Sequence, residues 1–269
     1  MKRTILAAFG VGLAAFSSAF VVNMRVFNFE YGETVGVPSD PVIEVGDTIH
    51  WVWNANFHSV TSSTGQSESF ASGLINTGST FDHTFTNIGD FGYYCDLHGS
   101  DLGNGQVIGM AGRVFVLAPK LAESFTIFRG LLQQGGISEL ASSDDQYMVV
   151  QKGFVLNLTE APIQVIMESA PVPPVPTQLV VRWEDGVNAS GLTRRVEVLN
   201  TVTSQFEQID QSAAQLADGK FSTKTSGDLS RFVDPVTQKV KVKFSYFNVG
   251  PVSNSAYQAR FDRFALLVK

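Results

Sequence analysis

The chain of 269 residues contains a single cysteine, Cys95, which lies three residues before His98. Met110 follows in a Gly-Met-Ala-Gly segment, and His58 lies upstream. A soft thiolate, two imidazoles and a weak thioether together select copper, in a trigonal arrangement of two histidines and one cysteine with a long axial bond. These four residues therefore predict a mononuclear copper site of the kind that transfers single electrons.

The first residues of the chain predict export. A short basic start precedes an apolar stretch from Ile5 to Phe16, and Ser17-Ser18-Ala19 offers a site for cleavage after a small residue. This pattern is typical of a signal peptide, here residues 1–19, and it implies a periplasmic or extracellular protein. The stretch is shorter than the roughly twenty apolar residues of a membrane span, so no span is expected. Because disulfides dominate outside the cytoplasm, a lone exported thiol needs another role, and metal ligation supplies one.

Composition and charge divide the remaining chain into two all-β domains. The residues are rich in Val, Phe, Thr and Gly, with turn signals at short intervals. Residues 20–119 carry ten acidic residues against two basic ones, whereas acids and bases are equal in number over residues 120–269. A strand that ends in Ala118-Pro119 marks the boundary. We expect one domain over residues 20–118 and a second over residues 122–269.

Alternating apolar and polar residues predict the strands of the first domain. Over residues 48–53 the pattern buries one isoleucine and two tryptophans and leaves His50 on the opposite face, where it is poorly placed as a ligand. Over residues 80–85 His83 shares a face with two phenylalanines and is expected to be a hydrogen-bonded packing residue. Further strands are predicted over residues 42–45, 91–95 and 113–117.

Several motifs resemble the plastocyanin/halocyanin branch of the cupredoxins, over about residues 22–118. They are Gly46-Asp47-Thr48, residues 53–60, residues 84–98 and residues 109–112. The resemblance implies a Greek-key β-sandwich that carries one type 1 copper ion at one end. It also implies that the ligands are His58, Cys95, His98 and Met110, three of them on the last loop between strands.

Two departures from that family concern the ligand loops. Eleven residues, 99–109, separate His98 from Met110, where the family usually has about four; this glycine-rich, polar insertion is expected to bulge out. Met110 is the expected axial ligand, and Gln106 is its rival, because a Gln oxygen can occupy that weak position. Ser59 stands where the family commonly has Asn after the first histidine. The hydrogen-bonded tie between the two ligand loops is therefore expected to be shorter or absent.

Other readings of the site remain open at this stage. Zinc also binds cysteine and histidine, although structural zinc sites seldom include a thioether. A copper oxidase or reductase needs a second copper centre, and the sequence has only four histidines, none after residue 98. We therefore expect an electron carrier and not an enzyme. The alternative is a non-redox protein, either a copper-binding carrier or a surface or structural binding module that retains the fold.

The second domain is predicted to be a jelly-roll-like β-sandwich. Strands are expected near residues 124–130, 147–153, 154–158, 194–200, 239–246 and 259–268, with an extended proline-rich connector over residues 170–176. This domain has neither His nor Cys, so no catalytic set is expected. Asp144-Asp145 could bind calcium or a sugar but is better explained as a solvated turn, and Trp183 is expected in the core instead of stacking on a sugar.

Partners are predicted from charge and architecture. The acidic first domain should attract a positively charged redox protein such as a basic cytochrome, because opposite charges accelerate encounter over long distances. The second domain is interpreted, from architecture alone, as a binding or docking module for a surface or a carbohydrate. No nucleic-acid partner is expected.

Overall fold

The computed structural model describes residues 19–157, 159–248 and 256–269, so all but Ala19 of the predicted signal peptide lies outside the described residues. Eight strands build the first half: β1 Val21–Phe27, β2 Glu30–Gly32, β3 Val42–Glu44, β4 Thr48–Trp53, β5 Thr61–Ser62, β6 Thr80–Thr84, β7 Gly89–Gly103 and β8 Gln106–Leu117. The second half contains β9 Lys120–Arg129, β10 Leu131–Gln134, η1 Ser138–Leu140, β11 Met148–Gln151, β12 Ile163–Ser169, β13 Leu179–Val187, β14 Leu192–Asn200, β15 Gln205–Ala213, β16 Gly219–Lys224, η2 Leu229–Phe232, β17 Lys241–Asn248 and β18 Gln258–Val268. In the described part of the chain, no helix is long and apolar enough to cross a membrane.

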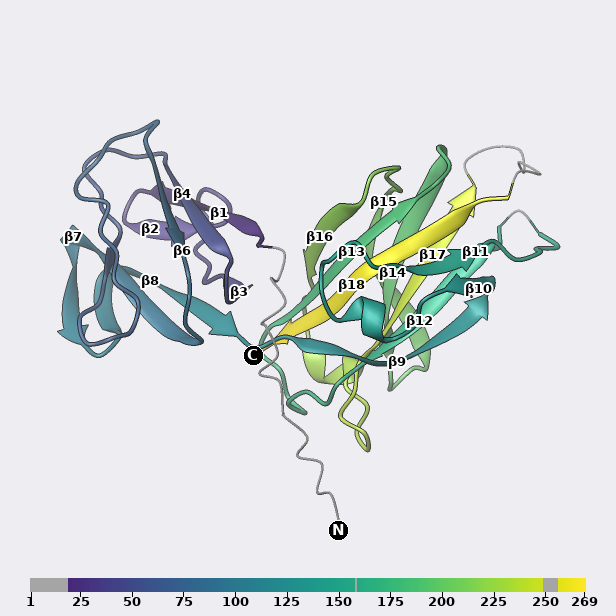
Figure 1. Cartoon of the computed structure of the whole chain (residues 1–269). Helices are drawn as coiled ribbons and strands as arrows, with labels where there is room; N and C mark the ends of the chain where they lie inside the picture. The colour runs from purple at the N-terminus through teal and green to yellow at the C-terminus, as the bar shows by residue number, and fades with distance from the viewer. Residues whose placement is uncertain (1–18, 158, 249–255) are drawn as a thin grey trace, which may run out of the picture.

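The first unit is a sandwich of two four-stranded sheets, ordered β2-β1-β4-β6 and β3-β8-β7-β5 (Figure 1). β1 runs parallel to β4, and β3 runs parallel to β8, so neighbours in the sheets are distant in the chain. The buried side chains of both sheets form one apolar core. This topology confirms the predicted Greek-key sandwich.

The alternation in β4 orients its side chains as the sequence predicts. Ile49, Trp51 and Trp53 are buried, and His50 on the other face pairs with Asp82, with 2.5 Å between Nδ1 and Oδ1. On the neighbouring strand His83 contacts Phe70 and Phe85 and hydrogen-bonds Glu68. His50 therefore forms a surface pair, and His83 is a hydrogen-bonded packing residue.

The second unit is a β-sandwich of ten strands, which confirms the predicted fold class. One layer contains β10, β11, β18, β13 and β16, and the other contains β9, β12, β17, β14 and β15; a short pairing of β18 with β9 joins them. Trp183 is buried in the core between the layers, as predicted.

The prediction of a strand over residues 154–158 is wrong. Both edges of β11 are already occupied by β10 and β18, so Phe154 and Leu156 remain exposed outside any strand, and residue 158 lies outside the described residues.

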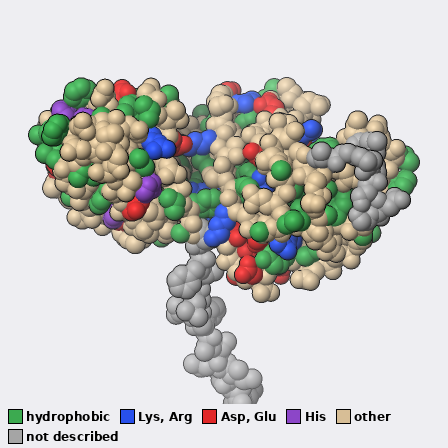
Figure 2. All heavy atoms as spheres, turned by 90° about the horizontal axis from the view of Figure 1, so that it is seen from above, with side chains coloured by type: hydrophobic (Ala, Val, Ile, Leu, Met, Phe, Trp, Pro, Cys, Tyr) green, Lys and Arg blue, Asp and Glu red, His purple; other side chains and the backbone are tan. Residues whose placement is uncertain are grey.

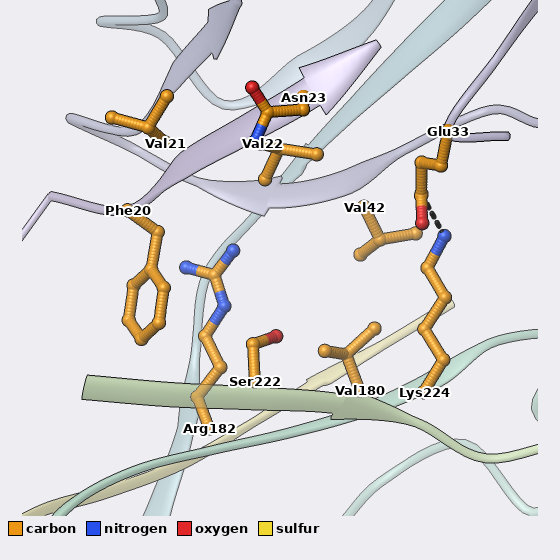
Figure 3. Close-up of a pocket in the computed structure, with 10 residues that line it drawn as sticks. All are labelled: Phe20, Val21, Val22, Asn23, Glu33, Val42, Val180, Arg182, Ser222 and Lys224. Atoms are coloured by element: carbon orange, nitrogen blue, oxygen red, sulfur yellow. Dashed lines mark hydrogen bonds and ion pairs between the residues drawn. The ribbon is translucent and has the colours of Figure 1, made fainter. Parts of the chain in front are cut away.

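The two units meet through a small apolar contact flanked by ion pairs. Val42 and Phe115 of the first unit pack on Val180 and Leu267 of the second. Figure 2 shows two lobes, with Lys and Arg side chains gathered near their junction. Beside this contact lies a cavity of about 340 Å³. In Figure 3 the side chains of Arg182 and Lys224 extend across this cavity from the second unit toward Phe20 and Glu33 of the first, and the dashed line marks the ion pair between Lys224 and Glu33.

Candidate metal centre

The cysteine and the second histidine lie on a bulge between the two longest strands of the first unit. In the β7–β8 register Tyr94 pairs with Ala111 and Gly99 pairs with Gly109. Four residues of β7, 95–98, therefore stand opposite the single residue Met110 of β8. Such an excess on one strand bends the backbone and redirects its side chains. The bulge explains how Cys95 and His98, three residues apart, can face one point.

The first histidine approaches from the segment that follows β4. His58 is 3% exposed, and its backbone carbonyl accepts a hydrogen bond of 2.9 Å from the Trp53 indole. The preceding residue, Phe57, has a φ of 61°, a conformation that L-residues adopt rarely and mainly in tight turns. His58 also bridges to Ile75 through main-chain hydrogen bonds. The protein's own hydrogen bonds therefore hold the backbone that carries the His58 imidazole.

Three donor atoms converge at this end of the sandwich. Cys95 Sγ lies 3.7 Å from His58 Nδ1 and 3.4 Å from His98 Nδ1, and the two nitrogens are 3.1 Å apart. These three side chains form one of the two clusters of potential metal ligands in the described residues. Edges of this length are close to those of three ligands about 2.0–2.3 Å from one ion with bonds spread about 120° apart. A soft thiolate with two imidazoles fits copper by its chemistry.

The surroundings of the donor atoms keep them available to a metal. Burial and the neighbouring His98 lower the pKa of His58, so the ring stays neutral, the form that binds metals. The backbone N–H of Ser59 donates to Cys95 Sγ at 3.4 Å. A donor aimed at the sulfur stabilises a thiolate and moderates its electron density.

A hydrogen-bonded tie between the two ligand loops is present, where the sequence predicted a shorter or absent one. The Ser59 hydroxyl accepts a hydrogen bond of 2.8 Å from the backbone N–H of Asp96, the residue after Cys95. Ser59 is fully buried, so its short side chain suffices because the two loops approach closely. The Thr61 hydroxyl adds a bond of 2.9 Å to the Asp96 carboxylate at the surface.

Removing this tie should weaken the site. We expect Ser59→Ala to destabilise the first unit by about 1–2 kcal/mol, because it leaves the Asp96 N–H without its partner. Copper affinity should fall about 10- to 100-fold, as for other groups that orient ligands. Chemical denaturation and competition with a copper chelator measure the two effects. Thr61→Val is the matched control: it removes the exposed bond to the same residue and should change both quantities much less.

The insertion between His98 and Met110, which the sequence predicted to bulge out, forms a β-hairpin. Residues 99–103 pair with residues 106–109, and the turn at Asn104-Gly105 has φ of 52° and 77°. Positive φ at both turn positions is typical of the type I′ turn, for which Asn-Gly is the strongest sequence signal. Asp101 holds the hairpin against the body of the unit by accepting hydrogen bonds from Ser63 and Thr64, which lower its pKa.

The hairpin separates the two rivals for the axial position. Gln106 is exposed, pairs with Gly103 beside the turn, and accepts a hydrogen bond from Arg113. Met110 is 2% exposed, belongs to the same buried cluster as Cys95 and lies across the strands from the ligand segment. Met110 thus lies beside the ligand segment, and Gln106 lies at the turn end of the hairpin.

An aromatic side chain that no sequence motif pointed to borders the site. Phe29, in the two-residue turn between β1 and β2, has a φ of 62° and stands edge-on to the His98 ring, with 4.8 Å between centroids. Its ring is also 5.9 Å from that of His58. Leu97 next to His98 is exposed as well. The only sequence signal was a large apolar residue in a tight turn, where a polar one is usual.

Comparisons with known proteins gave similarities to solved structures only. No family model matches the chain, and no curated protein matches it. An oxidized amicyanin variant is 24% identical, with 37% of this chain and 82% of that chain covered and a TM-score of 0.27. A reduced Cu(I) form of another amicyanin variant at pH 4 is 23% identical, with coverages of 39% and 87% and a TM-score of 0.27. The CBM22-1–GH10 modules of a Clostridium thermocellum endo-1,4-beta-D-xylanase, complexed with xylohexaose, are 12% identical, with coverages of 56% and 27% and a TM-score of 0.36.

Proposed function

We propose that this chain is an exported type 1 copper protein that transfers single electrons between redox partners. The observation that carries the proposal is the triangle of Cys95 Sγ, His58 Nδ1 and His98 Nδ1, with edges of 3.1–3.7 Å, at the buried end of a β-sandwich. One copper ion held there would alternate between Cu(I) and Cu(II). The pre-formed ligand loops favour this role, because a rigid site changes little when an electron arrives or leaves.

His98 is the proposed route for electrons to the surface. Its ring is half-buried, whereas Cys95 is fully buried and His58 nearly so. The exposed side chains of Phe29 and Leu97 lie beside it and provide an apolar surface on which a partner can dock closely. A short path from metal to partner through one ring suits a carrier, and the ligand set leaves no open position for a substrate.

Met110 is the proposed axial ligand, and a pair of substitutions tests it. We expect Met110→Leu to keep an intense visible absorption and to raise the reduction potential, because loss of a weak donor disfavours Cu(II). Gln106→Leu is the control at the exposed end of the hairpin and should leave the potential unchanged. Voltammetry of the copper-loaded variants measures both. A raised potential in the Gln106 variant alone would reverse the assignment.

The proposed partner is a positively charged redox protein, for example a basic cytochrome. The excess of acidic residues lies in the unit that carries the site, and the second unit is neutral, so attraction would orient the site toward the partner. The second unit is proposed as a docking module for a surface or carbohydrate.

The non-redox alternative is tested by redox cycling. The copper-loaded chain should bleach with ascorbate and regain its full colour with ferricyanide. Irreversible loss of colour or copper would favour a carrier of copper ions.

A further inference from the structure

A cluster of carboxylates lies in the second unit, far along the chain from the copper ligands. Asp145 follows η1 in the loop that leads to β11, Asp218 immediately precedes β16, and Asp262 lies in β18. One oxygen from each of the three lies within 4.8 Å of the others. Two oxygens on opposite sides of a Ca²⁺ ion, with bonds of about 2.4 Å, are separated by about this distance.

A fourth carboxylate, Glu184 on β13, independently points to a ligand. Its side chain is 6% exposed, and its Oε2 is shielded from solvent without a hydrogen-bond partner among the described residues. Glu184 pairs in register with Arg263, the neighbour of Asp262, and with Lys220, two residues after Asp218. A bulge at this point of β18 turns Asp262 toward the cluster. Glu184 thus lies on the strand between β16 and β18, close enough for its charge to raise the pKa of both Asp218 and Asp262.

The protein balances the negative charge of the cluster only in part. No ion pair joins any of the four carboxylates to a lysine or arginine in the described part of the chain; Arg260 is the cation that acts on Asp218 from nearby. Both oxygens of Asp218 are shielded from solvent, and the Tyr147 hydroxyl, which donates to Asp145 at 2.9 Å, lies close enough to Asp218 to lower its pKa as well. Asp262 is fully buried and accepts only long bonds from the backbone N–H groups of Asp144 and Asp145.

The burial of these carboxylates and the repulsion among them raise the pKa values of two of them. Burial raises the pKa of Asp262 to about 6, and burial together with the charge of Glu184 raises the pKa of Asp218. With a pKa of about 6, Asp262 is mostly ionised at neutral pH, so its repulsion with the neighbouring carboxylates persists there. Buried charges in native proteins are paired or coordinate metals, and within the described residues no lysine or arginine forms an ion pair with these carboxylates.

We propose that Asp145, Glu184, Asp218 and Asp262 bind one calcium ion, which fastens the loop after η1 to β13 and β18. All donors are carboxylate oxygens, the ligands that hard cations prefer, and this chemistry excludes copper as the resident ion. Calcium fits better than magnesium. Ca²⁺ accepts flexible, irregular shells of six to eight oxygens, whereas Mg²⁺ requires near-ideal octahedral geometry and retains several waters.

Calorimetry and thermal unfolding of the full chain test the proposal with Ca²⁺ alone. After treatment with a chelator, the chain should bind one Ca²⁺, and Tm should rise by about 5–10 °C at a concentration about 100 times the dissociation constant. Asp262→Asn and Glu184→Gln should each abolish this rise. Because each removes a repelling charge, the calcium-free variants should fold and should melt no lower than the calcium-free parent.

Matched controls separate this site from the copper centre and from surface charge. Asp144→Asn removes a carboxylate in the same loop that accepts hydrogen bonds from Gln146 and Ser142 instead of joining the cluster, and it should retain the full calcium response. Cys95→Ser should retain it too. The proposal is overturned if millimolar Ca²⁺ produces neither heat nor a Tm shift, if Asp262→Asn and Glu184→Gln respond like the parent, or if Mg²⁺ stabilises the chain while Ca²⁺ does not.

Discussion

Cys95→Ser is expected to abolish the intense visible absorption of the Cu(II)-loaded chain. That absorption arises from charge transfer between a thiolate sulfur and Cu(II), and Cys95 is the only cysteine in the sequence. The substitution exchanges a buried sulfur for an oxygen of similar shape, so the apoprotein should stay folded. Absorption spectra recorded at matched copper content measure the effect.

Controls for this substitution come from the two histidines outside the triangle. His50 pairs with Asp82 on the outer face of β4, and His83 packs against Phe70. His50→Gln should therefore leave both colour and copper content unchanged, whereas His58→Gln should lose the colour. If the Cys95 variant kept its absorption, the sulfur would not be a ligand, and a site built on His50 or His83 would have to be considered.

Arg182→Met is expected to destabilise the folded chain by about 3–5 kcal/mol, because it leaves a buried carboxylate without its counter-charge. Asp47 of the first unit is fully buried, and its Oδ2 lies 2.5 Å from Arg182 Nη1 of the second unit. A parallel pair joins Arg263 to Glu44 at 2.6 Å. Calorimetry should show a larger difference between the melting temperatures of the two units in the variant, because the ion pair that couples them is lost.

An exposed ion pair at the same junction provides the control. Lys224 pairs with Glu33, but both side chains are partly exposed, at 41% and 34%. Exposed pairs contribute about 0–1 kcal/mol, so Lys224→Met should change the unfolding free energy by no more than that. Restoring neutrality in the double variant Asp47→Asn, Arg182→Met should recover most of the loss. If Arg182→Met and Lys224→Met lowered the unfolding free energy equally, burial would not determine how much each ion pair stabilises this interface.

The parts of the fold with local signals could be predicted from the sequence. Alternation alone assigned the core face of β4 and the outward direction of His50. The motif around Cys95 located two of the three side chains that the structure brings together, because Cys95 and His98 are neighbours in sequence. His58 was located only through the resemblance of residues 53–60 to a known family. The hairpin after His98 had a signal as well, Asn104-Gly105, but the many glycines around it favoured a loop interpretation.

Other features depend on pairings that no local pattern encodes. Arg182 meets Asp47 across 135 residues, and Asp145 meets Asp262 across 117. Strand register decides such contacts: the bulge in β18 that places Asp262 is set by its pairing with β13. Asp145 was therefore interpreted as part of a solvated turn, because its partners could not be identified from the sequence.

Absorption and electron paramagnetic resonance spectra of the full chain loaded with one equivalent of Cu(II) test the central claim most directly. A trigonal site of Cys95, His58 and His98 predicts an intense visible band from copper–thiolate charge transfer, together with the narrow copper hyperfine splitting of a type 1 centre. A colourless protein with stoichiometric copper and wide splitting would contradict the account. So would a chain that excludes copper and retains zinc in this site.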